Sequence, residues 1–333
     1  MKYLNRPIAI NHIELHNRLV MPPMATAKAT EDGKVTPQLC HYYEEKAAGG
    51  YIGLIITEHS YVNLASKAGK GQLSIAEDGD VQGLEQLVRS IHQMGSKVMA
   101  QISHAGGAAK REVTGCPVLG PSAVPMPKTC FVPSEMSLAD IQNVIADFAA
   151  AALRAKKAGF DGVEIHSAHG YLLNQFYSPL ANQRQDAYGP QSLEGRLRLH
   201  LEIIQAIRQK VGTQYPVALR LGACDCMDGG TTLEDSVLAA QILEQAGIDL
   251  LDISGGFSGY THPCVSSQGY FSEWTEAIKK AVHIPVLLTG GIVDAQAAES
   301  LLTQGKADLI GVGRAILKDS LWPQKAFCQP IGE

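Results

Sequence analysis

The sequence predicts a single closed (β/α)8 barrel, the TIM-barrel fold, and three observations lead to this class. Eight short apolar runs alternate with eight longer amphipathic segments along the 333 residues. The runs are continuously apolar, as is typical of parallel strands buried on both faces. The order never reverses, which favours a closed barrel over an open, doubly wound sheet.

The strands are predicted from apolar runs that turn residues bound on each side. In chain order they span residues 18–22, 51–57, 97–103, 161–166, 216–221, 249–254, 285–289 and 308–312. The helices are predicted at residues 36–48, 81–94, 137–157, 193–211, 233–245, 272–281 and 294–303, with a closing helix from 314.

Capping residues support several of these boundaries. Thr36 and Pro37 suit the N-cap and first positions of the first helix, and Ser137 with Asp140 forms a capping-box pattern. A helix-ending glycine, a turn and the next strand recur at 158–163, 246–251 and 305–310.

The segment 105–133 contains five prolines and no periodic pattern. We interpret it as a long βα loop after the third strand that lies over the barrel mouth, because long loops in compact domains tend to be functional. With no linker elsewhere, residues 1–333 are predicted to form one domain.

Bulk composition excludes several classes of function. The net charge is −5 and no run of Lys or Arg exceeds two residues, which argues against nucleic-acid binding. No stretch of about 18 apolar residues predicts a membrane span, and the N-terminus lacks a signal-peptide core. Seven cysteines without a C-x-x-C pattern argue against a disulfide framework or a structural metal site. A cytoplasmic protein is expected.

In this fold the active site lies at the C-terminal ends of the strands, and the loops after strands 7 and 8 commonly bind phosphate. Gly290 and Gly291 follow the seventh strand, and Gly313 and Arg314 follow the eighth. Glycines let backbone N–H groups approach phosphate oxygens, and an arginine can bind them with two hydrogen bonds. These four residues predict a phosphate site, although glycines alone could simply form turns.

His166, His169 and Tyr171 follow the fourth strand. Two imidazoles can hold and polarise a carbonyl oxygen, and a tyrosine can act as a general acid. A metal site and a purely structural histidine pair are the alternatives. Gln101 and Arg220 lie on other strands that end at the same mouth, where Arg220 could stabilise negative charge on a ligand or form an internal salt bridge.

These residues resemble the old yellow enzyme group of NADH:flavin oxidoreductases, also called ene-reductases. The likeness covers residues 5–326. It is carried by residues 15–24, 53–58, 101–106, 162–172, 178–179, 182, 184, 186–189, 194, 196 and 311–314.

The resemblance implies FMN as the bound cofactor and NADH or NADPH as the transient reductant. Pro23, Met24 and Ala25 would line the flavin ring, Gln101 and Arg220 would contact its pyrimidine edge, and Gly290, Gly291, Gly313 and Arg314 would hold the phosphate. His166 and His169 would bind the carbonyl oxygen of an α,β-unsaturated substrate, and Tyr171 would protonate it. The alternatives are a flavin-dependent amine dehydrogenase or demethylase, a non-redox phosphate-binding barrel and a non-catalytic ligand sensor. A homo-oligomer remains open.

Several positions depart from the family pattern. Ala25 stands where relatives commonly have Cys or Thr, Ala27 where one subgroup has Tyr, and Gly107 where Arg is usual. The turn at residues 188–192 is one residue longer. The sequence ends at Glu333, so no iron–sulfur cluster region is expected, and residues 328–333 contain no arginine that could reach a neighbouring active site.

Overall fold

Eight parallel strands form a closed barrel in a computed structural model that describes residues 1–328. Their spatial order is β4-β3-β13-β12-β11-β10-β9-β6, and pairing of β4 with β6 closes the ring. The strands are β3 (Leu19–Met21), β4 (Leu54–Ile56), β6 (Lys97–Ser103), β9 (Gly162–Ser167), β10 (Val217–Gly222), β11 (Leu250–Ser254), β12 (Val286–Thr289) and β13 (Leu309–Gly311). The predicted fold class is confirmed.

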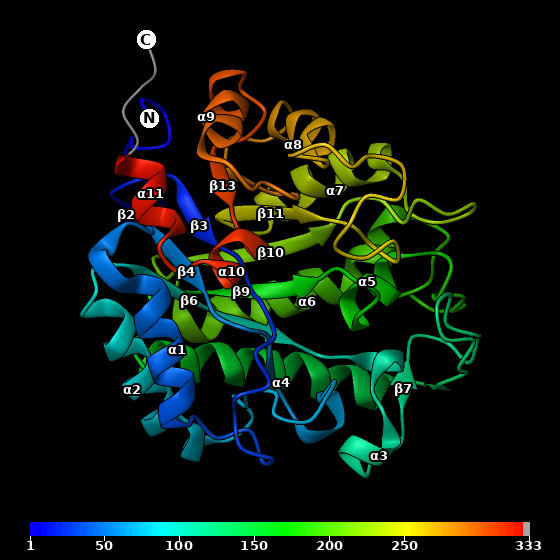
Figure 1. Ribbon diagram of the computed structural model, residues 1–333. Coiled ribbons are helices and arrows are strands. Elements are labelled where there is room, and N and C mark those ends of the chain that lie inside the picture. The colour runs from blue at the N-terminus through cyan, green and yellow to red at the C-terminus, as the bar shows by residue number, and fades with distance from the viewer. Residues whose placement is uncertain (329–333) are drawn as a thin grey trace.

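Helices connect these strands on the outside of the barrel (Figure 1). They are α1 (Pro37–Ala47), α2 (Val81–His92), α4 (Leu138–Lys157), α6 (Leu193–Val211), α7 (Leu233–Gln245), α8 (Ser272–Lys279), α9 (Ala295–Thr303), α10 (Arg314–Lys318) and α11 (Trp322–Cys328). The predicted caps are present: the Thr36 hydroxyl accepts a hydrogen bond from the Leu39 N–H, and Ser137 and Asp140 form a capping box.

Successive strand residues alternate between two cores, as the pleat requires. Outward-facing residues such as Val98, Leu219 and Ile253 pack in one cluster with the helices. Inward-facing residues form a separate apolar cluster inside the barrel, which we call the apolar layer. Its strand members are Val20, Leu54, Ile56, Met99, Ala218, Leu250, Leu287 and Leu309.

A hairpin that the sequence analysis did not predict closes the N-terminal end of the barrel. Strands β1 (Ile8–Ile10) and β2 (Ile13–Leu15) pair antiparallel. Ile10, Ile13 and Leu15 pack into the apolar layer, so this end is sealed from solvent. Three-residue strands carry too little periodicity to be found in a sequence, which explains the omission.

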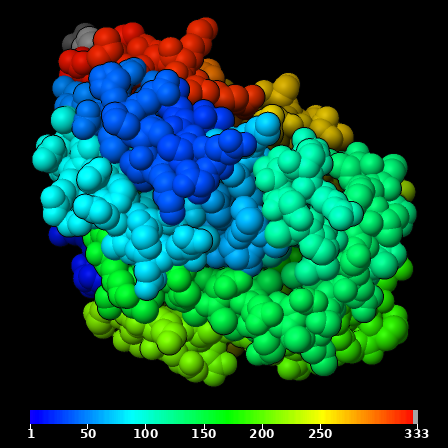
Figure 2. Space-filling view, turned by 90° about the horizontal axis from the view of Figure 1, so that it is seen from below, coloured from blue at the N-terminus to red at the C-terminus, as the bar shows by residue number. Residues whose placement is uncertain are grey.

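The segment after β6 is more ordered than predicted. It contains the helix α3 (Arg111–Thr114), and the two-residue strands β7 (Leu119–Gly120) and β8 (Ser134–Glu135) pair within it. Two further short elements were not predicted, β5 (Ser60–Tyr61) and α5 (Leu172–Tyr177). Figure 2 shows the region around residues 110–135 (turquoise) beside the N-terminal segments (blue and cyan).

No helix within residues 1–328 combines the length and the hydrophobicity that a membrane crossing requires. All seven cysteines are free thiols. Apart from Cys328, the terminal segment considered for a missing arginine lies outside the described residues.

Candidate active site

A cavity of about 590 Å³ opens at the C-terminal ends of the strands. In Figure 1 the arrows of β9, β10 and β11 point toward this end. The cavity brings together nearly all predicted site residues, namely Pro23, Met24, Ala25, Gln101, His166, His169, Tyr171, Arg220, Gly291, Gly313 and Arg314. Gly290 does not line it. Its carbonyl oxygen accepts hydrogen bonds from the N–H groups of Gly269 and Tyr270, so Gly290 shapes the loop behind the cavity.

The three residues predicted to bind and protonate a substrate form one cluster. The ring centroid of His166 lies 5.0 Å from that of His169 and 4.9 Å from that of Tyr171. His166 belongs to β9, and the other two belong to the turn that follows. His169 adopts a left-handed backbone conformation with φ = +61°, which is costly for a residue with a side chain. Such strain is common at functional sites.

Both histidines are neutral in this environment. Burial lowers the pKa of His166 and of His169 well below the ordinary value, and the positive charge of Arg220 acts in the same direction. Nε2 of His169 lies 2.7 Å from the Ser254 hydroxyl, which leaves Nδ1 as the ring nitrogen for a ligand. Nδ1 of His166 is buried without a hydrogen-bond partner among the described residues. Each ring can therefore offer one N–H to a ligand oxygen.

Tyr171 keeps its proton. Burial raises the pKa of Tyr171 to about 12, so the phenol is protonated at neutral pH. His59 lies beside it, with ring centroids 5.6 Å apart. Burial lowers the pKa of His59 to about 4, and Gln72 Nε2 lies 2.8 Å from its Nδ1. The sequence analysis assigned no role to His59, although its position directly after the second strand was a usable signal.

Below the histidines lies a buried ring of charged and polar side chains, which we call the polar layer: Gln101, Glu164, Arg220 and Asp252. Gln101 Nε2 donates to Glu164 Oε1 at 2.8 Å. Nε of Arg220 lies 3.0 Å from Oδ2 of Asp252, yet neither atom makes an aligned hydrogen bond within residues 1–328. The salt bridge considered for Arg220 thus exists by distance but leaves part of the guanidinium unpaired.

Burial also shifts the acids of this layer. It raises the pKa of Glu164 to about 8, and the negative charge of Asp252 adds to the effect. Burial raises the pKa of Asp252 to about 6, although Arg220 opposes the shift. Sequence reasoning missed both acids. The signal was alternation, because Glu164 precedes His166 by two residues and Asp252 precedes Ser254 by two.

The other end of the cavity suits a phosphate. Gly291 has φ = +67°, and a Cβ atom there would lie 2.5 Å from the Tyr270 ring, so both conformation and space require glycine. Arg314 begins α10, and its Nη2 donates to the Tyr270 hydroxyl at 3.2 Å. An arginine beside two glycine turns matches the chemistry of a phosphate ligand. Together with the unpaired Arg220 Nε, these groups fit an anionic cofactor such as FMN.

The cavity lining is cationic. Among residues 1–328 it includes no Asp or Glu, but it includes Arg220, Arg314 and Lys128. Lys128 was not singled out in the sequence because it lies in the irregular loop after β6. No group of three or more His, Cys, Asp or Glu side chains in the described part of the chain is arranged to hold a metal.

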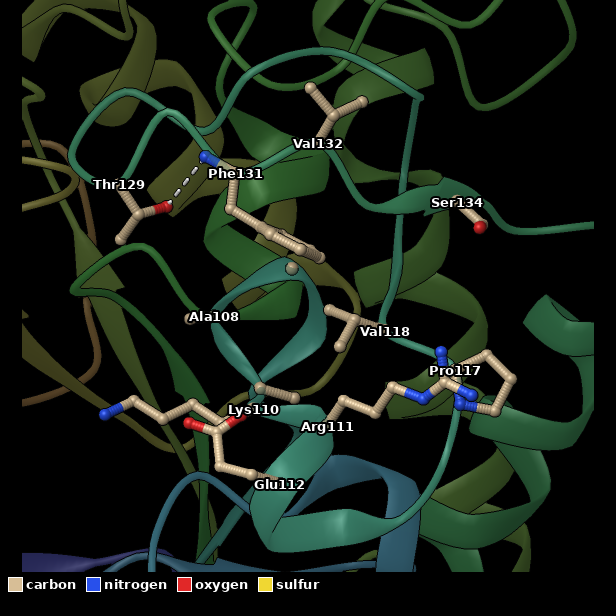
Figure 3. Close-up of a pocket in the computed structure, with 12 residues that line it drawn as sticks. Ala108, Lys110, Arg111, Glu112, Pro117, Val118, Thr129, Phe131, Val132 and Ser134 are labelled. Carbon is tan, nitrogen blue, oxygen red and sulfur yellow. Dashed lines mark hydrogen bonds between the residues drawn. The ribbon is translucent and has the colours of Figure 1, made fainter.

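A second cavity of about 490 Å³ lies within the segment after β6, and no predicted site residue lines it. Figure 3 shows Phe131 pointing from its loop toward Val118 and the turn that carries Ala108, with Lys110 and Arg111 on the helical side.

Comparison with known proteins identifies the family. Residues 3–329 match the NADH:flavin oxidoreductase / NADH oxidase family, which uses FMN. The chain belongs to this family. The predicted resemblance is therefore confirmed over nearly the whole sequence.

Relatives and solved structures agree with this assignment. An NADH oxidase from Thermoanaerobacter brockii is 41% identical over 95% of the chain, and the chain spans only 49% of that protein's length. An NADPH dehydrogenase from Halalkalibacterium halodurans is 39% identical over 95% of the chain and 91% of its own length. A 2-naphthoyl-CoA reductase bound to 2-naphthoyl-CoA superposes with a TM-score of 0.93 at 28% identity, over 98% of the chain and 52% of its own. An old yellow enzyme homologue from Zymomonas mobilis gives 0.85 at 27% identity, over 99% and 94%.

Proposed function

We propose that this family member is an FMN-dependent NAD(P)H oxidoreductase that reduces activated C=C bonds of α,β-unsaturated carbonyl compounds. The observation that carries the proposal is the shared cavity: the His166–His169–Tyr171 cluster lines the same space as Gly291, Gly313 and Arg314. The likeness to an old yellow enzyme homologue and to a 2-naphthoyl-CoA reductase supports it.

We assign the cofactor contacts to the residues that line the cavity on separate strands. Gly291, Gly313 and Arg314 would hold the FMN phosphate, with Gly290 shaping the loop behind them. Pro23, Met24 and Ala25 would contact the ring, and Gln101 and Arg220 its pyrimidine edge. When bound, FMN supplies hydride exchange between NAD(P)H and the β-carbon of the substrate.

The substrate contacts follow from protonation states. Neutral His166 and His169 can each donate one N–H to the same carbonyl oxygen, which withdraws electron density from the conjugated double bond. Tyr171 is protonated, and its phenol can deliver a proton to the α-carbon as negative charge develops there. Arg220 has an unpaired Nε within this site and can stabilise negative charge on a neighbouring heteroaromatic ring.

We further propose that the chain works as one FMN-binding barrel, since every proposed contact comes from strands and loops of the same closed sheet. Ala25 and Ala27 present methyl groups where relatives place larger side chains. A pocket with less side-chain contact to the flavin follows from this difference.

The test compares the two half-reactions of Tyr171→Phe with those of the wild-type protein. The purified wild-type protein should be yellow and should reduce 2-cyclohexenone anaerobically. Loss of the phenolic proton should slow enone reduction by about 10²- to 10⁴-fold, the usual range for a general acid. Reduction by NAD(P)H should change little.

Equal slowing of both half-reactions would refute the proton-donor role of Tyr171. A flavin that NAD(P)H reduces fully, combined with no enone turnover by wild-type protein, would refute the proposed activity. In that case amine donors would be tested next.

A further inference from the structure

Lys128 is a cation at the substrate end of the cavity without an assigned partner. It lines the same cavity as His166, His169 and Tyr171. Its Nζ packs against the loop after β11, 3.0 Å from the position that a Cβ atom on Gly259 would occupy. Its positive charge contributes to the lowered pKa of His169, which places Lys128 near that ring.

The charges around the cavity indicate what this lysine meets. Arg220 lies at ion-pair distance from Asp252, and Arg314 sits beside the glycine turns of the phosphate end. Lys128 forms no ion pair or hydrogen bond with any other group in residues 1–328, and the cavity lining there contains no carboxylate. Packing around Nζ lowers the pKa of Lys128 by disfavouring the charged form, a cost that a bound anion would offset.

We propose that Lys128 is a specificity-determining residue that binds a carboxylate or other anionic group of the organic substrate, remote from the carbonyl held by His166 and His169. This inference rests on the proposed function. It narrows the substrate class from enones in general to enones or enals that carry a negative charge.

The neighbouring lysine, Lys110, offers a matched control. It lies on the same segment after β6 but lines the second cavity and not the first (Figure 3). Removing its charge changes the net charge of the protein by the same amount as Lys128→Met. A nonspecific electrostatic effect would therefore appear in both variants.

The experiment measures KM for 4-carboxycinnamaldehyde and for its methyl ester in holoenzyme carrying Lys128→Met, Lys128→Arg, Lys128→Glu or Lys110→Met. Lys128→Met should raise KM for the carboxylate about fivefold, as for an ion pair near the surface. Lys128→Glu should raise it further, and Lys128→Arg should largely retain wild-type behaviour. The methyl ester and the Lys110→Met variant should change less than about twofold.

Binding without turnover gives a second readout. Titration with 4-hydroxybenzoate and with 4-hydroxybenzamide should show that Lys128→Met weakens binding of the acid alone. Equal KM changes for acid and ester would overturn the proposal. An effect confined to reduction by NAD(P)H would also overturn it, because the anion would then belong to the coenzyme. Wild-type protein that reduces neither aldehyde would refute the proposed function itself.

Discussion

The two halves of the barrel interior are equally buried but chemically opposite. On β10 and β11, Ala218 and Leu250 belong to the apolar layer, and Arg220 and Asp252, two residues further on, belong to the polar layer. Leu250 and Asp252 are both fully buried. The apolar layer has no polar side chain to satisfy. The polar layer leaves Glu164 Oε2, Arg220 Nε and Asp252 Oδ2 without hydrogen bonds among the described residues.

This difference shows where the fold gains stability and where it gives some up. Burying apolar surface stabilises the barrel, whereas an unpaired buried polar group costs free energy. Such groups persist in the polar layer because they face the cavity in which we propose that FMN binds. Mutations in the two layers should therefore have opposite consequences for stability and for ligand binding.

The largest effect should come from the apolar layer. Leu250→Ala leaves a void in a fully buried cluster and should lower the free energy of unfolding by about 2–5 kcal/mol. Urea denaturation measures this loss. Leu238→Ala on α7 is the control, since Leu238 is exposed and its removal should change stability by about 0.5 kcal/mol or less. Similar losses for both would contradict the proposed role of the apolar layer.

A substitution at the mouth should show the reverse pattern. His166→Ala removes a ring whose Nδ1 makes no hydrogen bond, so the thermal midpoint should change little. Binding of 4-hydroxybenzaldehyde should weaken by about tenfold or more, because a hydrogen bond to a phenolate oxygen is lost. The long-wavelength absorbance band of the complex measures it. An unchanged band would exclude His166 as a ligand contact.

The smallest effect should be a gain in stability. The pKa of Glu164 is raised to about 8 in the folded protein by burial and by Asp252. Between pH 4.5 and 8 the unfolded chain has therefore released a proton that the folded protein retains, and rising pH favours unfolding. Glu164→Gln removes this penalty. It should stabilise the cofactor-free protein by on the order of 1 kcal/mol at pH 8 and by much less at pH 5.

Asp161, just before the other end of β9, provides the opposite control. Burial alone would raise the pKa of Asp161, but hydrogen bonds from His92, the Val98 N–H and Lys97 lower it overall. This carboxylate stabilises the fold above its ordinary pKa, and its contribution is lost as the pH falls. Asp161→Asn should therefore destabilise the protein at neutral pH. Thermal melts of both variants across this pH range would show a shared sign if local burial alone set the effect.

The amino-acid sequence determined much of the fold. The eight apolar runs and their order predict the barrel, because continuously apolar strands must be covered on both faces. It did not reveal the β1–β2 hairpin or the short elements after β6, since two- and three-residue strands have no measurable period. Within the site, ordinal position at strand ends was enough to find His166, Arg220 and Arg314. Gly290 was grouped with the lining glycines because sequence does not show which side of a turn a residue faces.

By itself, therefore, the sequence determined the order of the strands, the residues at their C-terminal ends and the family. The tertiary structure decided which of those residues share a cavity. Closure of the ring, through pairing of β4 with β6, brings strand ends that are far apart in the chain to one mouth. It also decided which buried groups remain unpaired and placed Lys128 beside the histidines. Pairing and burial depend on neighbours from other strands and loops, and only the folded chain supplies those neighbours.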